Sequence, residues 1–240
     1  MDRLNKFIAA SGYTSRRKAD DLIINGKVKI NGKVIRELGT KVDGNDIVTV
    51  EGNVLKKEEN KVYYLLNKPR GIITAVSDDK NRKTVIDLID TDKRIYPVGR
   101  LDYDTTGALI LTNDGDLANI LMHPKSNIDK VYIAKVKGLI GKAEITKLER
   151  GVYIDGVKTS NAKARIRKYD KKTDSSIVEL TIHEGRNHQV KNMFAAIGYE
   201  VIKLKREKIA FLGVSDLKSG EYRELNIKEV KKLYNDAKNR

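Results

Sequence analysis

The chain has 240 residues, 40 % of them hydrophobic, which is enough to bury the core of one large domain or two smaller ones. Its formal net charge is +15, so we expect a polyanionic partner, with nucleic acid first. The absence of cysteine excludes disulfides and thiolate metal sites, and the three widely spaced histidines argue against a catalytic zinc. No signal peptide, membrane span or lipidation signal is evident, so the sequence predicts a cytoplasmic protein that does not engage a membrane.

The first 50 residues have the pattern of two helices followed by a hairpin. Apolar residues recur at helical spacing from Leu4 to a stop at Ser11-Gly12, and Ser15 can cap a second helix that ends at Asn25-Gly26. The apolar period then changes to two around the turn Asn31-Gly32, and residues 47–50 add a further strand.

Basic side chains gather in this N-terminal unit. They can be ordinary solvated charges or can face a phosphate backbone. The segments 3–8, 15–19 and 24–33 resemble the ribosomal-protein S-four RNA-binding domain. That resemblance implies RNA contact for the basic residues Arg3, Arg16, Arg17, Lys27, Lys29 and Lys33.

A second, larger domain follows a polar segment at 51–61 that we interpret as a linker, so the domains are expected at 1–60 and 61–240. Strands and helices are mixed along it, which predicts an α+β fold. The expected strands are 62–66, 109–111, 131–136, 177–182 and 201–204, with more strand pattern between 152 and 168. The expected helices are 117–122, 142–150, 188–197 and 227–237.

The segment 99–107, Gly-Arg-Leu-Asp-Tyr-Asp-Thr-Thr-Gly, runs directly into a buried-strand pattern. Its two carboxylates, Asp102 and Asp104, resemble the start of a calcium loop, but the twelfth position of that loop is Asn113 where a glutamate is needed. The two aspartates can also simply accept backbone hydrogen bonds within a turn. Taken alone, the segment favours this role of the two aspartates in forming the turn.

Two other segments bear on that interpretation. Residues 183–198 predict a strand end, a polar turn and a helix, with Asn187 as the cap and Gly198 as the stop. Lys191 lies one position off the apolar face of this helix, where it can reach a sheltered carboxylate and keep it ionised. Tyr132 is either strand core or an aromatic surface on which a base can stack.

Taken together these segments resemble the RsuA/RluB/RluF group of pseudouridine synthases, and the resemblance covers essentially the whole chain. It rests on residues 67–71, 98–107, 111–115, 121–124, 130–132 and 184–193, which occur in the order that the group shows. The resemblance implies isomerisation of uridine to pseudouridine in ribosomal RNA, with no cofactor and no metal. Asp102 then matches the catalytic aspartate, acting as a nucleophile on the nucleotide or as a base at the sugar.

The resemblance also implies roles for other residues. Tyr132 matches the tyrosine that packs against the target base, and Lys191 matches the basic partner of the aspartate, which is arginine in many members. Arg100 fits insertion into the RNA stack after the target nucleotide flips out. Asp104 and Thr105 are expected to shape the turn. Arg186, Asn187 and His188 are expected to face RNA, with no proton transfer assigned to His188.

Residues 115–119, 121–124 and 185–187 look most like the RluB branch, so we expect large-subunit (23S-type) rRNA near the peptidyl-transferase region as the substrate. The expected partner is ribosomal RNA or a pre-ribosomal particle, and the expected state is a monomer. Alternatives are the same chemistry on small-subunit rRNA or tRNA, and a non-catalytic ribosome-assembly factor.

Overall fold

The computed structural model describes residues 1–238, and the chain divides into two compact units. The first unit is Met1–Val62 together with Thr91–Arg94 and Asn113–Gly115, and the second contains the remainder. The elements of the first unit are β1 (Asp2–Arg3), α1 (Leu4–Ala10), α2 (Arg16–Ile24), β2 (Val28–Ile30), β3 (Lys33–Ile35), β4 (Lys41–Val42), β5 (Val48–Val50) and β6 (Asn53–Val54).

The first unit packs two helices against a small sheet, as the sequence predicts. The Ser15 side chain accepts a hydrogen bond from the Lys18 backbone N–H and so caps α2. The strands follow the order β3-β2-β5-β6, all antiparallel, and β1 pairs separately with β4. Asn31 and Gly32 both have positive φ in the turn that joins β2 to β3. The shared core contains Leu4, Phe7, Ile8, Ala19, Ile23, Val28, Val42, Val48 and Val50.

The expected linker at 51–61 is wrong for its first part, which belongs to the first unit. Glu51 and Gly52 form a second positive-φ turn, and β6 returns along β5. The Lys57 ammonium lies 2.6 Å from a carboxylate oxygen of Asp2, and the Glu58 backbone N–H donates to the carbonyl of Ala10. These contacts involve polar atoms, so the apolar pattern of the sequence does not reveal them.

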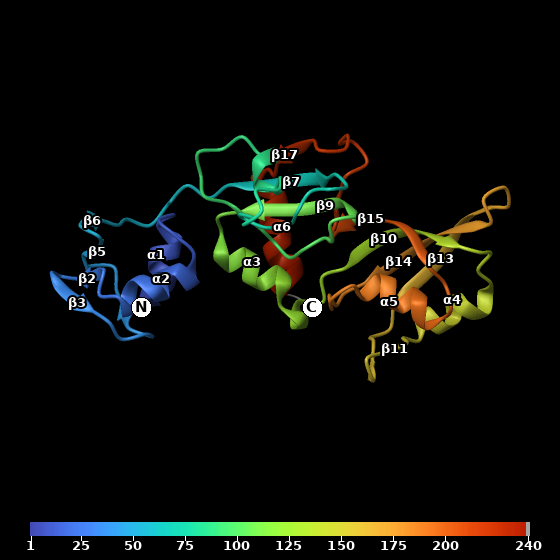
Figure 1. Ribbon diagram of the computed structural model, residues 1–240, viewed down its shortest axis with the longest axis horizontal. Helices are drawn as coiled ribbons and strands as arrows, with labels where there is room; N and C mark the ends of the chain where they lie inside the picture. Colours follow the sequence, from blue (N-terminus) through green and yellow to red (C-terminus); the bar gives the residue numbers. More distant parts are fainter. Residues whose placement is uncertain (239–240) are drawn as a thin grey trace. The chain divides into compact units, whose positions relative to one another are not determined.

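The second unit is built on a large mixed sheet (Figure 1). Its strands are β7 (Tyr63–Lys68), β8 (Tyr96–Pro97), β9 (Thr106–Thr112), β10 (Lys130–Lys137), β13 (Lys163–Asp170), β14 (Ser175–Ile182), β15 (Val201–Ile209), β16 (Leu212–Gly213) and β17 (Tyr222–Glu224). The remaining elements are η1 (Ile86–Leu88), α3 (Gly115–Met122), η2 (Pro124–Ser126), α4 (Lys142–Glu149), β11 (Tyr153–Ile154), β12 (Val157–Lys158), α5 (Gln189–Ala196) and α6 (Ile227–Lys238).

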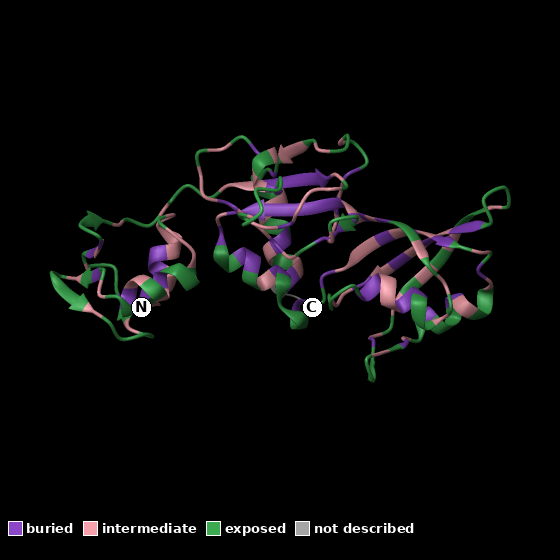
Figure 2. Ribbon diagram, in the orientation of Figure 1, coloured by how far each residue is buried: buried purple, intermediate pink, exposed green. Residues whose placement is uncertain are grey.

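The sheet runs β13-β14-β10-β15-β9-β7-β17, with β16 paired to β15 and β8 paired to β9. Its central strands are buried, and Figure 2 shows β7 and β9 in the buried colour along most of their length. Helices α3 and α6 pack against β7 and β9 and form one core with them, through Leu117, Ala118, Leu121, Leu233 and Ala237 against Leu65, Ala108 and Ile110. This layer makes a rigid base for the loop that precedes β9.

Strands β9 and β15 run parallel in the described part of the large sheet, and they meet directly after that loop. Strand β9 meets β15 with Gly107 opposite Arg206. Gly107 has φ +109°, and a Cβ atom there would lie 2.1 Å from the carbonyl oxygen of Arg206. Only glycine permits this close approach of the two backbones. The glycine therefore fixes where the 99–107 segment enters the sheet.

The predicted strands and helices of the larger unit are all present, with ends shifted by a few residues. Strand β15 extends to Ile209, well beyond the predicted end at residue 204, because the buried Leu204 and Arg206 alternate with the half-buried Lys205 in the centre of the sheet. The short strands β8, β16 and β17 were not predicted. Within residues 1–238, no helix has the length and apolar character required to cross a membrane.

Candidate active site

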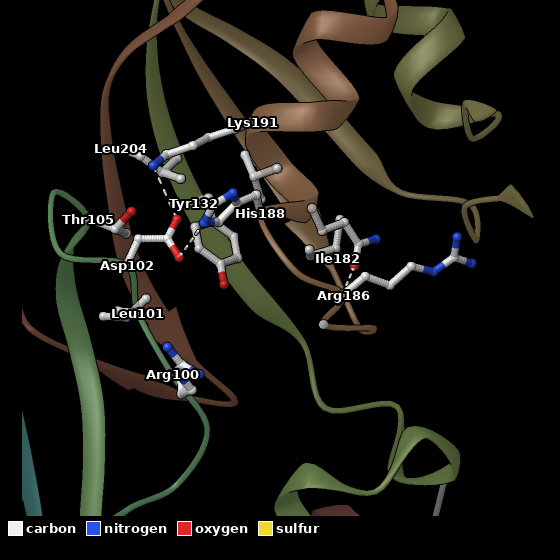
Figure 3. A pocket seen from close by; sticks show the side chains of 13 residues that line it. Arg100, Leu101, Asp102, Thr105, Tyr132, Ile182, Arg186, His188, Lys191 and Leu204 are labelled. Atoms are coloured by element: carbon white, nitrogen blue, oxygen red, sulfur yellow. Dashed lines mark hydrogen bonds and ion pairs between the residues drawn. The ribbon is translucent and has the colours of Figure 1, made fainter. Parts of the chain in front are cut away.

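A small pocket lies where the loop before β9 faces β10, β15 and the start of α5 (Figure 3). Its volume is about 60 Å³. The residues around it come from segments far apart in the chain: Arg100, Leu101, Asp102, Thr105, Tyr132, Ile182, Gly185, Arg186, His188, Gln189, Val190, Lys191 and Leu204. The tertiary fold thus brings together the three segments that the sequence singled out.

A buried lysine is hydrogen-bonded to the backbone of the loop that carries Asp102. Lys68 is 0 % exposed at the end of β7, and its ammonium donates to three backbone carbonyls, those of Pro69 (3.1 Å), Asp102 (3.1 Å) and Thr105 (3.0 Å). The Thr74 hydroxyl donates to the carbonyl of Leu101 at 2.7 Å. Because these bonds involve backbone atoms on both sides of Asp102, they define the direction of its side chain.

Burial lowers the pKa of Lys68 to about 8, and the negative charges of Asp102 and Asp104 only partly oppose this effect. Lys68 was not among the predicted functional residues. A signal was present, because a lysine at the end of a strand buried along almost its whole length needs hydrogen-bond acceptors. The position of those acceptors, on a loop more than thirty residues away, is a property of the fold.

Lys191 binds two carboxylates at once. Its ammonium is 3.1 Å from Oδ2 of Asp102 and 2.7 Å from Oδ1 of Asp104. Burial disfavours the charge on Lys191, but the hydrogen bonds to Asp104 and Asp102 outweigh it and raise the pKa of this lysine. The same hydrogen bond from Lys191 lowers the pKa of Asp104. Asp104 was expected to shape the turn, and in the structure it also accepts a hydrogen bond from Lys191.

His188 borders the same carboxylate, with Nε2 3.4 Å from Oδ1 of Asp102 and a side chain that is half exposed. It is also the N-cap of α5, with φ +50°, and makes no side-chain cap bond. The predicted cap at Asn187 is therefore wrong. The helix starts one residue later, because the chain turns through the left-handed region at His188 to bring Lys191 towards the loop. Asn187 is exposed beside it.

Tyr132 lies on β10 opposite Arg206 of β15 and Leu180 of β14, so it is on a central strand of the sheet. It is 9 % exposed and forms a wall of the pocket beside Asp102 (Figure 3). An aromatic wall next to a carboxylate suits a planar base held at van der Waals distance. Arg100 is exposed at the rim, two residues before Asp102.

Arg186 also lines the pocket, but its guanidinium is engaged within the protein. It donates to the carbonyls of Val157 (3.2 Å) and Lys158 (3.0 Å) in the β11–β12 hairpin and lies 3.4 Å from Glu184. The expected RNA contact of Arg186 therefore competes with a structural role. Gln189 is nearly buried and bonds to Glu184, which in turn accepts a hydrogen bond from the Ser160 N–H.

The basic residues predicted to touch RNA in the first unit are all exposed, namely Arg3, Arg16, Arg17, Lys27, Lys29 and Lys33. None of them lines the pocket described here. Across residues 1–238, no group of three or more acidic, histidine or cysteine side chains is placed to hold a metal ion. The side chains that line the pocket include the carboxylate of Asp102, the ammonium of Lys191, the imidazole of His188 and the ring of Tyr132.

A family model for RNA pseudouridylate synthase matches residues 62–196, which include Asp102, Tyr132 and Lys191. The chain belongs to the RNA pseudouridylate synthase family. A second model, for the S4 domain, matches residues 2–48. The predicted family, the α+β fold and the pseudouridine synthase activity are confirmed by these matches.

Proteins of similar sequence match this chain along almost its whole length. It is 58 % identical over 234 residues to ribosomal large subunit pseudouridine synthase B of Bacillus subtilis (strain 168), covering 97 % of this chain and 96 % of the relative. An uncharacterized RNA pseudouridine synthase of Aquifex aeolicus (strain VF5) is 42 % identical over 235 residues, covering 97 % and 93 %. A crystal structure of a pseudouridylate synthase superposes with a TM-score of 0.70 at 34 % identity, covering 97 % of this chain and 100 % of that one.

Proposed function

We propose that this pseudouridine synthase acts on a uridine of large-subunit ribosomal RNA and that Asp102 is its catalytic carboxylate. The observation that carries the catalytic assignment is the position of Asp102 in the pocket, on a loop anchored by Lys68, with Lys191 on one side and Tyr132 beside it. The substrate follows from the 58 % identity to the large-subunit enzyme of Bacillus subtilis.

The reaction moves a base without any net change in atoms. The C1′–N1 glycosidic bond breaks, the uracil turns, and a C1′–C5 bond forms. The proton on C5 is lost and N1 gains a proton, so no oxidant, reductant or metal enters the balance. The enzyme has to hold the detached uracil and stabilise the electron-deficient sugar while the base turns, and both tasks need a carboxylate close to C1′ and a wall against the base.

Asp102 can perform its task as a nucleophile at the sugar or as a base, and both routes begin from the ionised carboxylate. Lys191 supports that form, because an ammonium 3.1 Å away favours a negative charge on the oxygen. Asp104 keeps the lysine charged and in place. Tyr132 packs against the uracil, and Arg100 fills the space that the flipped nucleotide leaves in the RNA stack.

The wider proposal is a monomeric, cytoplasmic enzyme that uses no cofactor and takes ribosomal RNA or a pre-ribosomal particle as substrate. The S4 domain supports a second RNA-binding surface, formed by the exposed basic residues of the first unit. The net charge of +15 supports the same partner, because it raises the local concentration of phosphate-bearing molecules.

Asp102→Asn tests the assignment. The amide has nearly the shape of the carboxylate but cannot act as a nucleophile or base at neutral pH, so isomerisation should fall at least about 10⁴-fold, below detection, as for other groups that act directly on the reacting atoms. The assay is tritium release from large-subunit rRNA transcribed with [5-³H]uridine, followed by carbodiimide mapping of the modified position. Filter binding and thermal unfolding check that the variant still folds and binds RNA.

Asp79→Asn is the matched control, because Asp79 is exposed and lies outside the pocket. It should behave as the wild type. Pseudouridine at the wild-type position in rRNA treated with the Asp102→Asn variant would refute the catalytic assignment. Modification of small-subunit rRNA or tRNA alone by the wild-type enzyme would refute the substrate while leaving the site intact.

A further inference from the structure

A short hairpin lies beside the pocket, and none of its residues 153–158 is buried. Strands β11 and β12 pair through Tyr153–Lys158 and Ile154–Val157, joined by a turn in which Asp155 and Gly156 have φ of +49° and +77°. This is the tight two-residue turn that matches the natural twist of a hairpin. Strand β11 contacts α5, and in Figure 1 the tip of the hairpin projects beyond α4 and α5.

The base of the hairpin is rigidly attached. The Val152 N–H donates to the Thr159 hydroxyl at 3.0 Å, and the Thr159 N–H donates back to the Val152 carbonyl at 2.8 Å. Thr159 itself is buried, with 4 % of its surface exposed. Arg186 adds two bonds to the carbonyls of Val157 and Lys158. A hairpin of this length that depends on its own strands would be only marginally stable, so these contacts hold it in place.

The hairpin is also continuous with the catalytic pocket. Arg186 lines the pocket and binds β12 with the same side chain. Gln189 lines the pocket as well, and through Glu184 it reaches the backbone of Ser160 just past the hairpin. The position of the hairpin is therefore set by the same turn that places Lys191 against Asp102.

One face of the hairpin pairs an aromatic ring with a cation. Tyr153 and Lys158 are directly opposite each other in the register, so their side chains share a face. Tyr153 is 68 % exposed and Lys158 is exposed as well. Within the described residues 1–238, the side chains of Tyr153 and Lys158 form no hydrogen bond or ion pair with any other residue. Because the hairpin is already held at its base, the exposed tyrosine ring is available for a partner.

We propose that Tyr153 and Lys158 bind a nucleotide of the substrate RNA next to the flipped uridine, with the base stacked on the tyrosine ring and the phosphate paired with the lysine. An aromatic ring beside a basic side chain is the arrangement that suits an unpaired nucleotide. The positive charge of Lys158 and the direct connection to the pocket favour RNA over a protein partner. The inference rests on the RNA substrate proposed above, and Arg186 is then the link between this subsite and the pocket.

Tyr153→Ala, Tyr153→Phe and Lys158→Ala test the subsite in the full-length enzyme, with tritium release from large-subunit rRNA as the readout. We expect Tyr153→Ala to raise KM about 10-fold, from the loss of one stacked base. The value of kcat at saturating RNA should stay close to that of the wild type, since the reacting atoms are untouched. Tyr153→Phe should restore the wild-type KM, because phenylalanine keeps the ring.

Lys158→Ala should reduce the salt dependence of RNA binding. The slope of log Kd against log[salt] should change by about 0.7, the value for one phosphate contact on a single strand. Lys172→Ala is the control, because Lys172 is another exposed lysine of the same unit and does not line the pocket. It should leave both KM and this slope unchanged.

A wild-type KM for Tyr153→Ala together with an unchanged salt slope for Lys158→Ala would overturn the subsite, including the case in which the hairpin binds a ribosomal protein instead. Photocrosslinking with 4-thiouridine in the rRNA gives a second readout, and a crosslink that maps to Tyr153 supports the proposal. Failure of the wild-type enzyme to release tritium from large-subunit rRNA would refute the proposed substrate, and this outcome is seen before any hairpin variant is measured.

Discussion

Lys68→Met tests whether a buried lysine holds the catalytic loop. The substitution keeps the length of the aliphatic chain and removes the three hydrogen bonds to the carbonyls of Pro69, Asp102 and Thr105. The Thr105 carbonyl bond is fully buried, so its loss should cost about 1–3 kcal/mol. The two partly buried bonds from the charged donor contribute about 1.5–3 kcal/mol each.

Methionine also removes the cost of burying the charge. Burial lowers the pKa of Lys68 from 10.5 to about 8, and at 1.36 kcal/mol per pKa unit this cost is about 3 kcal/mol. The balance is a net loss of about 3 kcal/mol in the free energy of unfolding at pH 7. The assay is urea unfolding of both proteins, followed by a signal from the larger unit. A loss of less than about 1 kcal/mol would refute the reasoning.

The same pKa shift sets a pH dependence with a definite sign. Between pH 8 and 10.5 the lysine has lost its proton in the folded protein and keeps it in the unfolded chain. The unfolded chain then binds more protons, so the free energy of unfolding of the wild type rises with pH. The difference between wild type and Lys68→Met should widen by about 3 kcal/mol over this range. Lys130, whose pKa burial also lowers to about 8, is present in both proteins and cancels. A difference that stays constant with pH would show that Lys68 is not held as described.

Two other substitutions test the geometry of the site. Gly107→Ala should destabilise the protein by about 3 kcal/mol or more, because its Cβ would lie 2.1 Å from the carbonyl oxygen of Arg206 at φ +109°. Gly156→Ala is its control, with φ +77° but no atom within 4 Å of the new Cβ, and equal losses in thermal unfolding would contradict the role of the close approach. Asp104→Asn should lower the pKa of Lys191 and move the alkaline limb of the kcat–pH profile to lower pH, because the carboxylate that now raises that pKa is gone. Profiles that superimpose would show that the Asp104 contact does not matter for catalysis.

Much of the fold could be predicted because it depends on local patterns. The Ser15 cap of α2, the turn at Asn31-Gly32 and the buried strand after Gly107 are set by side chains and φ angles within a few residues, and all three are present. Where a local signal was ambiguous, the prediction failed. Asn187 and His188 are both polar residues before a helix start, and His188 is the N-cap of α5, which begins at Gln189.

The candidate site also has features that local patterns predict and features that depend on the tertiary fold. Local sequence patterns were sufficient to place Asp102 in a turn before a buried strand and Lys191 near the start of a helix. The contacts between these segments depend on the tertiary structure: Lys191 lies between Asp102 and Asp104, Lys68 binds the backbone of their loop, and Arg186 joins the pocket to the β11–β12 hairpin. These contacts join residues that are between about thirty and ninety positions apart in the chain. Their geometry depends on the packing of the whole sheet, including the parallel pair that Gly107 permits, and no pattern within a single segment contains that information.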